Sequence, residues 1–204
     1  MATKISYIGF LILTFFSIIS IEIAADTNEI SKEITKDPQK VIETIFATAQ
    51  KGNPLESKDS SALLDQLFNY NQLALNILGK GIPNLGAQDV SWFQKTIKEI
   101  ITKTVYPKST DFLKNVKITY RKTQMDNSKA KVSSVVQSKG EETDVVYILE
   151  KTSDEKWRVV DVAIDDESWV KTINEKMMKS YKEKGWKGVK DLLNKRLVEL
   201  KKSK

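Results

Sequence analysis

The chain has 204 residues, of which 40% are apolar and 29% are charged, and these values are typical of one soluble globular domain. It contains no cysteine and no histidine, which excludes disulfides, zinc–cysteine sites and the commonest general base and metal ligand at neutral pH. The formal net charge of +6 is concentrated in residues 179–204, which hold ten Lys or Arg against three Asp or Glu. Such a tail can attract an anionic membrane, an acidic protein or nucleic acid, or it can be the solvated face of an amphipathic helix.

The first 25 residues have the parts of a secretory signal peptide. Lys4 precedes an apolar run over residues 5–21, and small residues end the segment at Ala25, as in segments that are cleaved after export. An uncleaved membrane anchor is the alternative, but Glu22 stands near the end of the run and no strong basic flank follows. We therefore expect cleavage after Ala25, a periplasmic mature chain and no nucleic-acid partner.

Helical signals occupy the next part of the chain. Asp37 precedes a proline and an apolar stripe of helical spacing, which predicts an N-cap and a first helix. Two short helices are expected over the apolar residues of 63–68 and 73–78. Asp89 predicts the start of a longer helix, and Pro107 predicts its end.

The hydrophobic period then changes from helical to alternating. Apolar residues at every second position predict four strands, and the polar linkers between them are short enough for hairpins. The expected strands cover residues 116–121, 129–137, 143–150 and 157–164. Two further helices are expected after the last strand, separated by Gly185.

This order predicts an α+β fold in which a four-stranded antiparallel sheet has its helices packed on one face. Residues 26–36 are polar and are expected to form a flexible N-terminus, followed by a single domain over residues 37–204. The apolar space between sheet and helices can be a closed core or an open ligand pocket, and periodicity allows both.

The acidic residues around the last strand are candidates for either helix capping or catalysis. Asp161 alternates onto the face opposite its apolar neighbours, and Asp165, Asp166 and Glu167 stand where a helix is expected to begin. Carboxylates there are favoured by the helix dipole, so capping explains them better than acid–base chemistry. With no nucleophile paired to a base and no phosphate-binding loop, we expect no enzyme and no metal site.

The stretch from Trp157 to Asp165, W-R-V-V-D-V-A-I-D, resembles the W-[KR]-V-x-D-V-x-I-[DE] strand of the MlaC-type periplasmic phospholipid carriers. Ser168, Val170 and Gly185 follow in the matching places, and weaker matches extend the resemblance over roughly residues 38–200. The chain departs from the family pattern at residues 80–83, where K-G-I-P replaces an aromatic and basic pair.

The resemblance implies an NTF2-like fold with a deep apolar pocket that holds a glycerophospholipid. It also implies a monomer, without a cofactor, that shuttles lipid between two complexes and so maintains outer-membrane lipid asymmetry. The partners would be the substrate-binding component of an inner-membrane ABC transporter and an outer-membrane lipoprotein–porin complex.

Face alternation together with the resemblance selects the expected lipid-binding residues. They are Phe93, Ile97, Ile100, Tyr106, Tyr120, Val132, Tyr147, Leu149, Val160, Val162, Trp169, Ile173 and Met177. Four basic residues of the tail are expected to dock the partners: Lys182, Lys187, Lys190 and Lys195.

Two other hypotheses remain open at this point. The first is an NTF2-like enzyme, or a binding protein, for another small hydrophobic ligand, which would show a polar pair at the pocket floor. The second is a non-catalytic interaction module whose basic C-terminal helix binds acidic partners.

Overall fold

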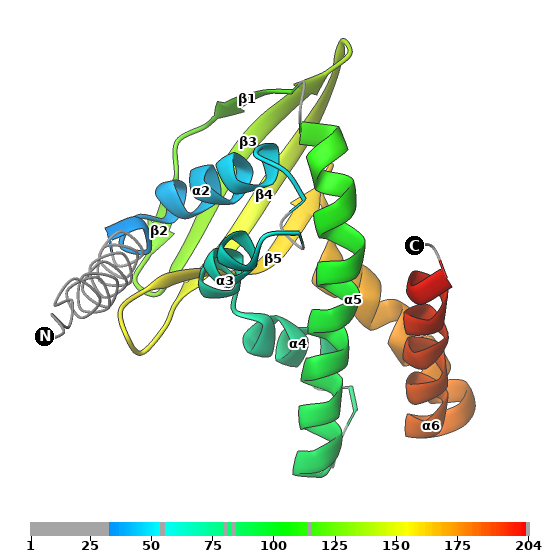
Figure 1. Cartoon of the computed structure of the whole chain (residues 1–204). Coiled ribbons are helices and arrows are strands. Elements are labelled where there is room, and N and C mark those ends of the chain that lie inside the picture. The colour runs from blue at the N-terminus through cyan, green and yellow to red at the C-terminus, as the bar shows by residue number, and fades with distance from the viewer. Residues whose placement is uncertain (1–32, 54–55, 80, 83–84, 114–115, 203–204) are drawn as a thin grey trace, which may run out of the picture.

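The computed structural model describes residues 33–53, 56–79, 81–82, 85–113 and 116–202. The expected signal peptide over residues 1–25 and most of the expected flexible N-terminus lie outside the described residues. No helix in the described part of the chain is both long and apolar enough to cross a membrane. An antiparallel sheet and the helices around it make up the structure (Figure 1), so the predicted α+β class is confirmed.

The first long helix, α2 (Pro38–Gln50), begins as the sequence predicts. The Asp37 carboxylate accepts hydrogen bonds from the backbone N–H groups of Gln39 and Lys40 at 2.8 and 3.3 Å. The chain is already fixed before this cap, because the Thr35 side chain is 1% exposed and its carbonyl accepts from the Trp157 N–H at 2.7 Å.

Within the described residues the sheet has six strands, so the prediction of four is wrong in number. The strands are β1 (Lys117–Tyr120), β2 (Gln124–Asp126), β3 (Lys129–Ser138), β4 (Glu141–Lys151), β5 (Trp157–Ile164) and β6 (Glu167–Ser168). Neighbours pair antiparallel in the order β1-β3-β4-β5-β6, and β2 also pairs with β3. The predicted meander is therefore present, with two very short strands in addition. Strand β2 follows β1 along the same edge of β3, and β6 lies at the opposite edge of the sheet, next to β5.

Strand β6 exists because Asp165 and Asp166 form a two-residue hairpin turn rather than the start of a helix. Both have positive φ, 47° and 65°, as a type I′ turn requires, and aspartate adopts this conformation more readily than most residues. Ile164 then pairs with Glu167, and Ala163 with Ser168. The expectation that these carboxylates cap a helix is wrong for this pair.

A bulge in β5 corrects the predicted alternation of its side chains. Ile148 pairs with Asp161, but the next residue of β4 pairs with Val159, so Val160 is the extra residue of a β-bulge. Val159 and Val162 consequently belong to the core on the inner face of the sheet, whereas Val160, although 1% exposed, does not.

Helices α3 (Lys58–Leu67), α4 (Tyr70–Leu78), α5 (Ala87–Leu113) and α6 (Trp169–Lys202) complete the fold. Pro107 lies inside α5, so the predicted end at this residue is wrong. Proline removes only its own N–H from the helical ladder, and the helix can continue beyond it at a cost in stability. The predicted break at Gly185 is confirmed, since its φ of 62° and ψ of −159° interrupt α6.

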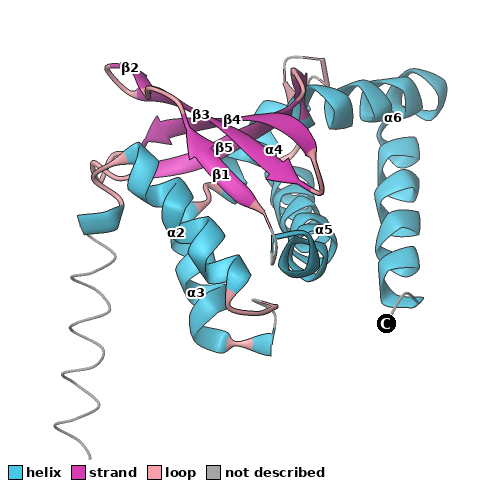
Figure 2. Ribbon diagram, turned by 90° about the horizontal axis from the view of Figure 1, so that it is seen from above, coloured by secondary structure: helices cyan, strands magenta, loops and turns pink. Residues whose placement is uncertain are grey.

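The helices build two apolar cores. The first lies between the inner face of the sheet and α2 and α3, and it includes Phe46, Leu64 and Tyr147. The second joins α4, α5 and both halves of α6 around Phe93, Met177 and Val189. Figure 2 shows α2, α3 and α5 on the same side of the sheet, with α6 extending beyond the sheet.

Candidate functional site

A partly enclosed cavity of about 170 Å³, here named the enclosed cavity, lies between the inner face of the sheet and helices α2, α3 and α5. The Phe46 and Tyr147 rings, which meet edge to face with centroids 5.9 Å apart, form part of its wall. All its lining residues are apolar or aromatic: Ile45, Phe46, Ala49, Leu64, Phe68, Ile101, Val105, Val136, Val145, Tyr147, Val162, Ile164 and Trp169. A cavity of this kind excludes ions and favours hydrocarbon.

A larger outer cavity of about 730 Å³ opens between α5, the β5–β6 hairpin and α6. It shares Ile101, Val105, Ile164 and Trp169 with the enclosed cavity, so these four residues separate the two spaces. Ile100 and Ile173 also line the outer cavity, and its polar lining residues are Thr104, Asp165, Glu167, Thr172, Lys176 and Arg196.

A groove of about 520 Å³ continues from the outer cavity between α5 and the two halves of α6. Ile100, Ile101 and Ile173 line both spaces, and Ile97, Met177 and Leu193 extend the apolar wall along the groove. The three spaces adjoin one another along α5 and share apolar walls, and together they are called the branched apolar region.

Two tyrosine phenols on the inner face of the sheet, Tyr120 and Tyr147, resist ionisation. Burial raises the pKa of the Tyr147 phenol, and the neighbouring Tyr120 phenol raises it further. Burial, with a contribution from Glu43, raises the pKa of Tyr120 to about 12. Both phenols therefore remain neutral at physiological pH, and neither can supply an anion to catalyse a reaction.

Seven of the thirteen residues predicted to contact a ligand line these spaces: Ile97, Ile100, Tyr147, Val162, Trp169, Ile173 and Met177. Five others, Phe93, Tyr120, Val132, Leu149 and Val160, do not line them. Phe93, for example, is fully buried and packs against Trp186 at 6.1 Å between centroids. The side chain of Tyr106 lies outside the described part of the structure.

The sequence predicts a pocket between the strands and the two helices that follow Asp89 and Ser168. The structure shows that α2 and α3 also contribute to the cavity wall. The additional lining residues include Ile45, Phe46, Ala49, Leu64 and Phe68. The helical spacing of these residues indicates a buried face, but it does not indicate whether that face meets a void.

A capping arrangement fixes the start of α6 and with it the position of Trp169. The Asp161 carboxylate accepts from the Ser168 hydroxyl at 2.6 Å and from the Val170 N–H at 3.1 Å. The Ser168 oxygen in turn accepts from the Lys171 N–H at 3.0 Å. Asp161 is thus a capping residue, and the cap comes from the strand rather than from residues 165–167.

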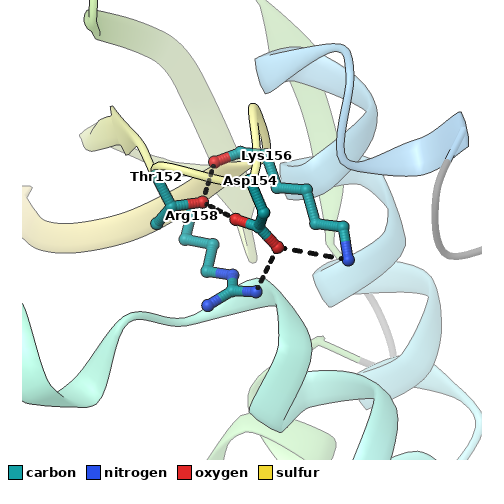
Figure 3. Close-up of polar contacts among 4 residues, drawn as sticks. All are labelled: Thr152, Asp154, Lys156 and Arg158. Atoms are coloured by element: carbon teal, nitrogen blue, oxygen red, sulfur yellow. Dashed lines mark hydrogen bonds and ion pairs between the residues drawn. The ribbon is translucent and has the colours of Figure 1, made fainter.

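A cluster of polar residues stands at the other end of β5, far along the strand from the outer cavity. Figure 3 shows the Asp154 carboxylate between Lys156 and Arg158, each at 3.3 Å, with the Thr152 hydroxyl beside it. The hydrogen bond from Thr152, followed by those two cations, lowers the pKa of Asp154. This network closes the β4–β5 turn, and a carboxylate held in its ionised form there has no proton to donate near neutral pH.

The four lysines expected to dock partners have different surroundings. Lys190 forms an ion pair with Asp89 at 2.6 Å and lies 5.6 Å from the centre of the Trp92 ring. Its hydrogen bond lowers the pKa of Asp89, and the pair ties the end of the chain to α5. Lys187 pairs with Asp191 within its own helix, while Lys182 and Lys195 are exposed. Within the described residues, no group of three acidic side chains could hold a metal ion.

The fold and these cavities define a class of protein: an α+β domain that holds a branched apolar space between its sheet and its helices. The chain belongs to the MlaC family, since the family model described as MlaC protein matches residues 32–195. No curated protein matches the chain.

Among solved structures, a phospholipid-binding protein from Ralstonia solanacearum, in complex with a phospholipid, has the same fold. The TM-score is 0.67 at 17% sequence identity, and the similarity covers 79% of this chain and 95% of that chain.

Proposed function

We propose that this protein is a periplasmic carrier that buries the acyl chains of a glycerophospholipid in the branched apolar cavity. The observation that carries the proposal is a cavity with purely apolar and aromatic walls between sheet and helices, which shares Val105 and Trp169 with a larger cavity at the surface. Membership of the MlaC family and the phospholipid named with the Ralstonia protein support the choice of ligand.

The physical need for such a carrier follows from the hydrophobic effect. Two acyl chains contain about thirty methylenes, and each costs roughly 0.8 kcal/mol to expose to water. A free phospholipid therefore crosses an aqueous gap very slowly. Moving the chains into a protein cavity replaces one apolar environment by another, so the lipid can both enter and leave.

The transport path is part of the proposal. The carrier takes lipid between the substrate-binding component of an inner-membrane ABC transporter and an outer-membrane lipoprotein–porin complex, and this traffic maintains outer-membrane lipid asymmetry. It acts as a monomer without a cofactor and catalyses no reaction. We also propose that the fold is NTF2-like and that the protein is exported through a cleaved signal peptide.

Native mass spectrometry of protein purified without detergent tests lipid binding directly. We expect co-purifying phospholipid, and uptake of phospholipid from vesicles by protein that has been stripped of it. Protein that is always empty and takes up nothing from vesicles would contradict the proposal. Bound ligand that is hydrophobic but not a phospholipid would favour a carrier of another small molecule.

Docking through the basic tail has a separate test. Changing Lys182, Lys187 and Lys195 to Glu should slow transfer between the two membrane complexes and leave bound lipid unchanged, because these side chains are exposed and do not line the cavities. Lys190 is left intact in this variant because its ion pair with Asp89 joins two helices. Unchanged transfer rates would reject the docking surface.

A further inference from the structure

Two cationic side chains stand where the outer cavity and the α5–α6 groove meet. Lys176 and Arg196 line both spaces. They come from the two halves of α6, on opposite sides of the break at Gly185. The chain therefore brings two positive charges from separate helical segments to the boundary between the outer cavity and the groove, and Asp165 and Glu167 also line the outer cavity.

Neither cation forms a strong ion pair with another residue that the structure describes. Lys176 forms no ion pair with any residue that the structure describes. Among the residues that the structure describes, Arg196 pairs only with Glu199, three residues further along its own helix, at 3.4 Å and with both side chains more than two-fifths exposed. An exposed pair of this kind contributes little stability, so an anion at the junction can compete for the guanidinium.

An unsatisfied hydroxyl lies in the wall of the same cavity. The Oγ1 atom of Thr104 is buried and has no hydrogen-bond partner in the described structure, and Thr104 lines the outer cavity. Buried polar atoms are normally satisfied, so a hydroxyl without a partner beside a cavity indicates a group supplied by a ligand. The ester carbonyl of a glycerolipid is an acceptor of the required kind.

We infer that Lys176 and Arg196 bind the phosphate of the phospholipid headgroup, and that Thr104 donates a hydrogen bond to an ester carbonyl next to it. The inference rests on the proposed lipid-carrying function and adds the position of the polar end. The phosphate of a glycerophospholipid is attached close to the point where its acyl chains join, so a lipid whose chains enter the apolar branches places its phosphate at the junction. A guanidinium and an ammonium then form charge-assisted hydrogen bonds with it.

The test compares lipids that share acyl chains and differ in the phosphate. Lipid-stripped protein is incubated with phosphatidylcholine vesicles that contain equal amounts of phosphatidylglycerol and of diacylglycerol, and the lipids that it takes up are counted by mass spectrometry. The variant carries Lys176→Gln and Arg196→Gln. The control carries Lys171→Gln and Lys201→Gln, which removes the same charge from exposed positions of the same two helical segments.

We expect the preference of the wild-type protein for phosphatidylglycerol over diacylglycerol to fall by about tenfold in the variant, the magnitude of one exposed charge-assisted contact to each cation. The control should keep the wild-type preference. Equal preferences in all three proteins would overturn the inference while leaving lipid carriage intact. Wild-type protein that takes up neither lipid would instead contradict the proposed function.

Two further measurements separate the alternatives. Inorganic phosphate should not bind to stripped protein at concentrations at which the lipid saturates it. Saturable binding of phosphate would reveal a site for the free anion and would overturn the assignment to a headgroup. Thr104→Val should leave the stripped protein at least as stable as the wild type and reduce phosphatidylglycerol uptake severalfold. Undiminished uptake by that variant would remove Thr104 from the site.

Discussion

The enclosed cavity makes a prediction about Ala49, a small side chain in its wall. Ala49 lines the cavity and is 4% exposed, so Ala49→Leu adds three carbon atoms to a space that is apolar on all sides. The cavity has a volume of about 170 Å³, and unfilled apolar space lowers the stability of a protein. Filling part of it should therefore stabilise the lipid-free protein, by roughly 2 kcal/mol for three buried carbon groups.

The same substitution should weaken lipid binding. The added carbons occupy space that about three methylenes of the acyl chain would otherwise fill, so the affinity for phospholipid should fall by roughly 2 kcal/mol, or about thirtyfold. Denaturation of stripped protein in urea gives the change in stability, and uptake from vesicles gives the change in affinity. Opposite signs in the two measurements are the signature of a ligand cavity.

Ala74 provides the matched control, because it is fully buried in the second core and lines none of the three spaces described. Ala74→Leu overpacks a filled core and should destabilise the protein by about 1–3 kcal/mol. If Ala49→Leu destabilises the stripped protein as much as Ala74→Leu does and leaves lipid uptake unchanged, the cavity is not the acyl-chain site.

Other substitutions test the elements that position the cavity. Gly185→Ala should lower the free energy of unfolding, measured in urea, by about 1–3 kcal/mol. The cause is backbone strain alone, since φ is 62° and no atom lies within 4 Å of the added Cβ. An unchanged midpoint would contradict the strained break in α6. Asp161→Ala should cost about 1–2 kcal/mol through loss of its cap, whereas Asp166→Asn, at a positive φ that Asn tolerates, should cost nothing measurable. Hydrogen bonding lowers the pKa of Asp89, so the melting temperature of wild type should exceed that of Asp89→Asn above about pH 4 and approach it as the pH falls through the lowered pKa. A difference independent of pH would contradict the ion pair.

Elements with local chemical signals were predicted correctly. Asp37 followed by a proline specifies a helix start, and Gly185 specifies a break, because each depends on the residue itself and its immediate neighbours. Elements that depend on pairing were missed. Strand β6 has only two residues and is defined by its partner β5, and the Asp165–Asp166 turn lacks the glycine that normally marks a type I′ hairpin.

The distinction between a core residue and a cavity residue could not be predicted from periodicity. Val132 and Tyr147 are direct cross-strand partners on the inner face of the sheet, so alternation treats them alike. Only Tyr147 lines the enclosed cavity, while Val132 is completely covered by its neighbours. The difference depends on where helices pack across the sheet, and that information lies in long-range contacts rather than in the spacing of apolar residues.

The location of the cavity follows from the presence of two cores. Phe68 and Val105 are half-buried and pack against both the sheet core and the helical core, and both line the enclosed cavity. Helix α5 therefore packs against both the sheet core and the helical core. Its side chains fill the space between these two cores less completely than the side chains within one core fill theirs. The branched space lies along that boundary, so a ligand chain entering it contacts both cores. Lipid binding should accordingly stabilise the two cores together, and the protein should unfold more cooperatively with lipid than without it.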